Sequence, residues 1–304
     1  MPDSYVEVPV TEAVRQAAAL AREGRFEEAE PLLKDAAEAE PPDPLALYNL
    51  GTLRLRLGDP QGATILLARA LDLAPRLYGA ANNLAVAQLA LDETEAARRA
   101  LAQAAAIAPD RPEPFSNLGL ICLRELDFPC AVESLSKARA LAPDNVTVRT
   151  NLAHAFARQD PQAAEDEYRE VLRRAPNHVP ALGGLATILI GRQDITGADA
   201  LVRRALELDP RDVVTRVNAG VVAENRNQPA EAEAHYRAAL EVDPTSPVAW
   251  YDLGHLLERM GRVADAKAAY ETYLDHPKDV MEASYIRYRL SRLAELPPGG
   301  APQP

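Results

Sequence analysis

The chain has 304 residues, a net charge of -12 and an isoelectric point near 5.0, and only 5% of its residues are aromatic. This length buries a core without disulfides or metals, and the acidic balance argues against binding to nucleic acids or to anionic membranes. No apolar run long enough for a transmembrane helix and no leader-like segment is seen, so we expect a cytoplasmic protein without membrane insertion. The composition is rich in Ala, Arg and Pro and poor in Lys, which indicates a bacterial source.

The sequence repeats with a period of 34 residues, and one step of 33 occurs at the same place for two residue types. The alanines of this pattern are Ala29, Ala63, Ala97, Ala131, Ala164, Ala198, Ala232 and Ala266. The prolines are Pro41, Pro75, Pro109, Pro143, Pro176, Pro210 and Pro244. A period of this length is typical of solenoids, in which one supersecondary unit is stacked many times.

Each repeat is predicted to form two amphipathic helices. In the second repeat, apolar residues recur at helical spacing over 44–57 and again over 62–73, and Gly58-Asp59-Pro60 predicts a turn between them. Proline shortly after the second helix prevents its continuation. Because one hairpin cannot bury its own apolar stripe, neighbouring hairpins must stack.

This pattern resembles the tetratricopeptide repeat, whose signature is W-x2-L-G-x2-Y followed by A-x3-F and P. The last repeat matches best, through Trp250, Leu253, Gly254, Ala266 and Tyr270. The resemblance implies an all-α fold, an α-solenoid in which about eight helix-turn-helix repeats form a right-handed superhelix with a C-terminal capping helix.

We predict four segments along the chain. They are an N-terminal extension over 1–9, an eight-repeat array over 10–277, a capping helix over 278–296 and a disordered tail over 297–304. The first repeat is acidic, since residues 1–43 hold 11 acidic and 4 basic residues, a net charge of -7.

No catalytic pattern is present: we find no Gly-rich phosphate loop, no nucleophile elbow and no H-E-x-x-H helix. The histidines lack the spacing of metal ligands, so we expect no metal, no cofactor and no enzymatic activity. His154 and His255 share one repeat position, and we interpret both as polar residues of a groove. Cys122 and Cys130 fall on the two helices of one hairpin, and buried free thiols are favoured over a bond between them.

The candidate binding residues lie on the first helices, which line the concave groove in the family that this chain resembles. Counting Pro44 as the start of the second repeat, the sixth residue is polar in most repeats, as Asn49, Asn83, Asn117, Asn151, Asn218 and Asp252. An asparagine amide can pair with both the C=O and the N–H of an extended peptide, and the resemblance to asparagine-ladder arrays implies this role. The alternative is that these asparagines bridge adjacent repeats.

The twelfth and thirteenth residues add selectivity to this groove. The twelfth residue is apolar in the early repeats but Glu224 and Glu258 in the last two, which predicts a groove that ends in acidic character. The thirteenth residue is often arginine, as Arg22, Arg56, Arg124, Arg158 and Arg259. These arginines are suited to bind carboxylates of a partner, and the alternative is a solvated head whose stem packs on its helix. No lysine lies on a first helix, so a lysine clamp for a C-terminal carboxylate is not expected.

We therefore expect a non-catalytic scaffold that binds an extended or helical segment of another protein. The alternative is a self-associating structural subunit of a bacterial secretion, pilus or motility assembly. Gly183 and Gly184, inside one first helix, and the shortened repeat before them also predict a weak joint around repeats five and six. The alternative for the glycines is that close helix packing there needs a bare backbone.

Overall fold

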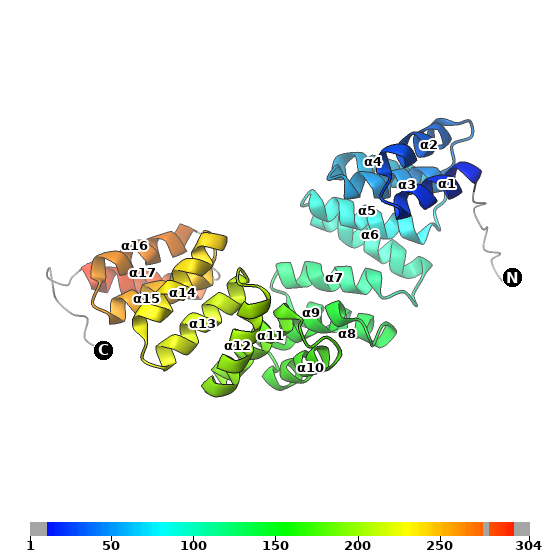
Figure 1. The fold of residues 1–304 in the computed structure, drawn as a ribbon. Coiled ribbons are helices and arrows are strands. Elements are labelled where there is room, and N and C mark those ends of the chain that lie inside the picture. Colours follow the sequence, from blue (N-terminus) through cyan, green and yellow to red (C-terminus); the bar gives the residue numbers. More distant parts are fainter. Residues whose placement is uncertain (1–10, 276–279, 295–304) are drawn as a thin grey trace. The chain divides into compact units, whose positions relative to one another are not determined.

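The computed structural model describes residues 11–275 and 280–294, and these residues form seventeen helices and no strand (Figure 1). The extension predicted over 1–9 and the tail predicted over 297–304 lie outside the described residues. The chain divides into two compact units, Met1–Asn151 and Leu152–Pro304, called here the N-terminal and the C-terminal unit. Among the described helices, none combines the length and the apolar character that crossing a bilayer requires.

The helices follow one another in the order expected for eight hairpins and a cap. The N-terminal unit contains α1 (Glu12–Arg22), α2 (Phe26–Glu38), α3 (Pro44–Arg56), α4 (Pro60–Leu73), α5 (Tyr78–Ala90), α6 (Thr94–Ile107), α7 (Glu113–Arg124) and α8 (Phe128–Leu141). The unit boundary falls inside α9 (Val146–Phe156). The C-terminal unit continues with α10 (Pro161–Arg174), α11 (Val179–Gly191), α12 (Ile195–Leu208), α13 (Val213–Asn225), α14 (Pro229–Val242), α15 (Pro247–Arg259), α16 (Val263–Asp275) and α17 (Val280–Ala294). Hairpin partners pack on each other in both units, as α3 does on α4 and α13 on α14, and α17 packs on α16 as the predicted capping helix.

The repeating alanine packs inside every hairpin, as the sequence pattern predicts. All eight of these alanines are fully buried, with 0% of their surface exposed. The small residue on the facing first helix is equally constrained, because a Cβ atom added to Gly119 would lie 2.4 Å from Leu135 Cγ. A Cβ atom on Gly254 would lie 2.6 Å from Tyr270 Cδ1 in the same way. Small residues are therefore required where the two helices of a hairpin cross.

A residue with left-handed backbone conformation marks the turn of each hairpin except the fifth. These residues are Gly24, Gly58, Asp92, Leu126, Gln193, Asn227 and Gly261. The single 33-residue step falls in the fifth hairpin, where α9 ends at Phe156 and α10 begins at Pro161. The residue that this repeat lacks is thus the left-handed turn residue, and α10 begins one residue early in the repeat. The shorter turn is still capped, since Asp160 Oδ1 accepts a hydrogen bond of 3.0 Å from the Ala163 amide.

The two interior glycines of α11 lie in close helix contacts. A Cβ atom on Gly184 would lie 2.3 Å from Cζ of Tyr168, and one on Gly183 would lie 3.2 Å from Oγ1 of Thr215. These contacts support the alternative in which the glycines serve packing rather than a weak joint.

Candidate functional site

Two of the predicted asparagines of the N-terminal unit, Asn83 and Asn117, form a chain of hydrogen bonds between first helices together with Asn82, which was not predicted. Asn117 Nδ2 on α7 donates to Asn82 Oδ1 on α5 at 3.1 Å. Asn82 Nδ2 donates to the neighbouring Asn83 Oδ1 at 3.3 Å, and Asn83 Nδ2 donates to Thr52 Oγ1 on α3 at 2.9 Å. These contacts join three successive repeats, which is the bridging role that we gave as the alternative.

The C-terminal unit repeats this bridge at Asn218 on α13. Its buried amide donates to the Gly183 carbonyl at 2.9 Å and to Thr187 Oγ1 at 3.0 Å, both on α11. Asn49 differs, because its amide donates at 2.7 Å to the Leu45 carbonyl of its own helix. Asn151 on α9 is half-buried.

The predicted arginines divide into two groups. Arg124 on α7 forms an ion pair of 3.1 Å with Asp92 of the preceding hairpin turn, and Arg259 on α15 forms one of 2.6 Å with Glu224 on α13. Arg158, just beyond α9, is exposed. In contrast, Arg22 and Arg56 form no ion pair or hydrogen bond with any residue in the described part of the chain. This pair is therefore available to an anion.

The acidic side chains predicted for the end of the groove are neutralised by neighbours. Glu224 accepts a hydrogen bond of 2.6 Å from the Tyr236 hydroxyl, in addition to its ion pair with Arg259. Glu258 is buried and accepts a bond of 2.8 Å from the Tyr270 hydroxyl and two from the Arg289 guanidinium of α17. The expected acidic end is therefore corrected, because both carboxylates are held in internal contacts.

The two histidines at one repeat position have different surroundings. His154 on α9 is exposed. His255 on α15 lies among aromatic rings, with centroid distances of 5.4 Å to Tyr251 and 6.5 Å to Tyr285. Burial lowers the pKa of His255 below its usual range. Asp252 on α15 is half-buried, and burial raises the pKa of Tyr236 with a further contribution from the Asp252 charge.

A cavity of about 190 Å³ lies between α1, the start of α2 and α3. It is lined by Ala17, Ala18, Ala21, Arg22, Phe26, Ala29, Leu33, Asn49, Thr52, Leu53 and Arg56. Three residues predicted from the sequence, Arg22, Asn49 and Arg56, thus meet at one cavity. The guanidinium carbon of Arg56 lies 6.0 Å from the centroid of the Phe26 ring.

The apolar character of this surface continues along the next first helices. Thr52 occupies the ninth position of its repeat, and the ninth residues of the two following repeats are Val86 on α5 and Leu120 on α7. Val86 is 38% exposed and Leu120 is 42% exposed. We call the cavity together with Val86 and Leu120 the first-helix face.

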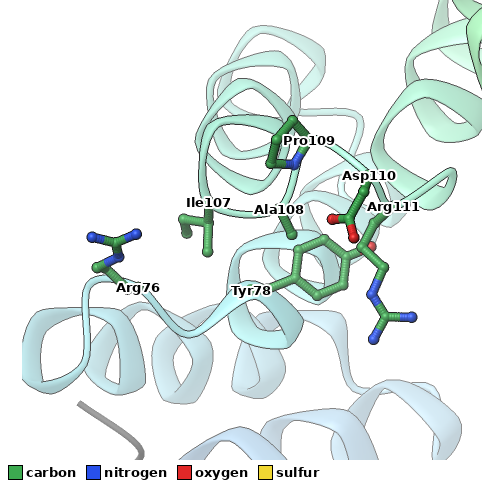
Figure 2. Close-up of a pocket in the computed structure, with 7 residues that line it drawn as sticks. All are labelled: Arg76, Tyr78, Ile107, Ala108, Pro109, Asp110 and Arg111. Carbon is green, nitrogen blue, oxygen red and sulfur yellow. The ribbon is translucent and has the colours of Figure 1, made fainter. Parts of the chain in front are cut away.

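A second cavity, of about 500 Å³, lies at the loops that follow α4 and α6 (Figure 2). Arg76 and Arg111 lie on opposite sides of Tyr78 in this view, and Ile107, Ala108, Pro109 and Asp110 complete the lining. The Tyr78 hydroxyl donates to Glu113 at 2.8 Å, and the Arg111 guanidinium lies 5.6 Å from the Tyr78 ring centroid. Helical spacing does not predict this cavity, because most of its residues lie in the loops between helices.

The two cysteines form a disulfide, so the expectation of free thiols was wrong. Their Cα atoms are 5.7 Å apart, because the end of α7 and the start of α8 meet at the hairpin turn. This separation is within the usual range for disulfides.

Family models described as tetratricopeptide repeat match residues 20–75, 155–217 and 225–284, and a further one matches residues 116–179. The chain belongs to the tetratricopeptide repeat family. No curated protein matches it.

Solved structures similar to this tetratricopeptide repeat chain share its fold at low sequence identity. A tetratricopeptide repeat protein from Parabacteroides merdae has a TM-score of 0.61 and 21% identity, covering 81% of this chain and 98% of that one. The Cut9–Hcn1 hetero-tetramer of the APC/C gives a TM-score of 0.67 and 18% identity, covering 84% and 50%. A monomeric IFIT1 mutant with Gppp-AAAA gives 0.62 and 19%, covering 93% and 73%. At these identities the likeness shows the fold alone.

Proposed function

We propose that this tetratricopeptide repeat protein is a non-catalytic, cytoplasmic scaffold that binds a segment of another protein on the first-helix face. The fold commonly mediates protein–protein interaction, which supports a protein as the partner. The observation that carries the proposal is the cavity beside α1 and α3, continued by the exposed apolar side chains of Val86 and Leu120.

The asparagines have two proposed tasks in this function. Asn83 and Asn117 hold adjacent repeats in register through their amide donors. Asn49, which bonds only within its own helix, lines the cavity and is the asparagine best placed to contact a partner backbone. We assign Asn151 and Asp252, on α9 and α15, to the same class of backbone contact in their own repeats.

The nature of the partner follows from charge. The IFIT1 mutant was solved with Gppp-AAAA, so a structure of similar fold can hold a nucleotide ligand. A net charge of -12 disfavours that class of ligand for this chain. The Cut9–Hcn1 structure, a hetero-tetramer, supports a protein partner instead.

The test uses peptides selected from a random phage-displayed library on the immobilised full chain. We expect a selected peptide to bind the Val86→Glu/Leu120→Glu variant about tenfold or more weakly, because a carboxylate there must be desolvated on binding. The matched control is Ile65→Glu on α4, a second helix, where the replaced side chain is 62% exposed. Equal binding to wild type and to the double variant would refute the proposal, and so would a selection that enriches no peptide.

The same protein preparation separates the scaffold from a self-associating subunit. A scaffold keeps one mass in light scattering as protein concentration rises, whereas a self-associating subunit gains mass by mass action.

A further inference from the structure

We propose that the cavity between α1, α2 and α3 selects an acidic side chain that lies next to a large apolar residue in the partner segment. This inference rests on the proposed function and names the chemistry that the first-helix face recognises.

The two arginines at this cavity differ from the others at the same repeat position. Arg124 and Arg259 are satisfied by carboxylates of the preceding repeat. Arg22 and Arg56 are exposed, line one cavity and have no carboxylate partner among the described residues. Their place in the last turn of α1 and α3 suits the helix dipole, but the dipole does not require that both meet at one cavity.

Apart from Asn49 and Thr52, the rest of the cavity lining is apolar. Leu33, Leu53 and the small side chains of Ala17 and Ala29 are buried and form its inner surface. The half-buried Phe26 ring lies beside Arg56 at the rim. An apolar side chain entering the cavity loses contact with water, which favours binding by the hydrophobic effect.

Charge complementarity identifies the second element of the ligand. The guanidinium groups of Arg22 and Arg56 bring two planar, permanently charged donor groups to the mouth of an apolar cavity. A carboxylate accepts paired hydrogen bonds from such a group, and these bonds strengthen when water is excluded by an adjacent apolar contact. Residues 1–43 carry a net charge of -7, which disfavours an acidic segment on this repeat in general, whereas Arg22 and Arg56 attract a carboxylate at the cavity. The cavity therefore selects a segment by the position of its acidic residue as well as by its charge.

The test compares the full-length wild type with Arg22→Glu/Arg56→Glu. Arg69→Glu/Arg99→Glu is the matched control, because it makes the same charge change at exposed arginines of the second helices α4 and α6. Each protein selects peptides from the same random phage library. We expect wild type and control to enrich peptides with Asp or Glu beside Leu, Ile, Met or Phe. We expect the Arg22/Arg56 variant to enrich Lys or Arg at that place.

Affinity then tests the assignment directly. A wild-type-selected peptide, labelled with fluorescein, should bind about tenfold more weakly to Arg22→Gln/Arg56→Gln than to wild type. Its Glu→Gln analogue should bind the two proteins equally. Circular dichroism melting confirms that each variant is folded.

Selected peptides without acidic residues, or equal affinity for wild type and the Gln variant, would overturn the inference. If such peptides still lose affinity for Val86→Glu/Leu120→Glu, the proposed function stands and only the acidic selectivity fails. If they are insensitive to both sets of substitutions, the proposed function fails as well.

Discussion

Asn83 on α5 donates a hydrogen bond of 2.9 Å to Thr52 Oγ1 on α3, one repeat earlier. The same two repeat positions are joined in the C-terminal unit, where Asn218 donates to Thr187 Oγ1 at 3.0 Å. A polar pair at the sixth and ninth positions thus fixes how one first helix lies on the next. The bridging amides are therefore engaged in contacts within the array.

Asn218→Ala should lower the free energy of unfolding by about 1 to 3 kcal/mol, because it removes the hydrogen bonds that a buried amide donates to the Gly183 carbonyl and to Thr187 Oγ1. Asn49→Ala is the control, since that amide bonds only to its own helix, and it should cost much less. Urea denaturation measures both. Equal midpoints for the two variants would show that the bridge does not stabilise the array.

Leu126→Gly should stabilise the protein by about 1 kcal/mol, since Leu126 has φ of 59° in the turn between α7 and α8. Three other hairpins have glycine at this turn position, and the Leu126 side chain is 52% exposed, so little packing is lost. Leu126→Ala keeps the Cβ atom and should gain far less. Thermal melts of the three proteins check this, and a lower melting temperature for the glycine variant would contradict it.

Gly184→Ala and Gly191→Ala should change stability in opposite directions. A Cβ atom at Gly184 would collide with the ring of Tyr168, which is buried, whereas no atom lies within 4 Å of a Cβ at Gly191. We expect the first to destabilise by about 1 to 3 kcal/mol and the second to stabilise by up to about 1 kcal/mol. Stabilisation by both would show that α11 does not need a bare backbone. In that case α11 would be a weak joint, and hydrogen exchange should show weaker protection over 179–191 than over 112–124.

Stability should fall as the pH drops below about 6.5, in part through His178. Its Nδ1 accepts a hydrogen bond from the Ala181 amide at the start of α11, and burial lowers its pKa. The unfolded chain therefore binds a proton at a higher pH than the folded one, so stability is lost between pH 6.5 and the lower folded pKa. His178→Asn keeps a capping acceptor that does not titrate, and urea midpoints across this range should vary less for it than for wild type. If the urea midpoints of the two proteins change equally with pH, His178 does not contribute to the pH dependence of stability.

The fold could be predicted from the sequence because the same small and apolar residues recur at the same positions of each repeat. Ala131 and its equivalents are buried by geometry that any hairpin of this kind shares, so periodicity alone places them. The 33-residue step indicates that the fifth repeat is one residue short. Only the backbone conformation shows that the missing residue is the left-handed turn residue before α10, which begins at Pro161.

The candidate site was only partly predictable. Repeat position placed Arg22, Asn49 and Arg56 on first helices, and the structure shows that they meet at one cavity. Position alone does not determine whether an arginine has a partner, because Arg124 is paired through Asp92, a turn residue that follows no helical spacing. The Cys122–Cys130 bond depends likewise on how close the hairpin ends approach, which the sequence does not give.

Hydroxyl-radical footprinting with a selected peptide tests the location of binding most directly. The side chains to compare are Val86 and Leu120 on first helices with Ile65 and Leu73 on the second helix α4, which are 62% and 50% exposed. If the first-helix face binds the peptide, oxidation of Val86 and Leu120 falls while that of Ile65 and Leu73 stays the same. Protection of Ile65 and Leu73, with Val86 and Leu120 unchanged, would contradict the account.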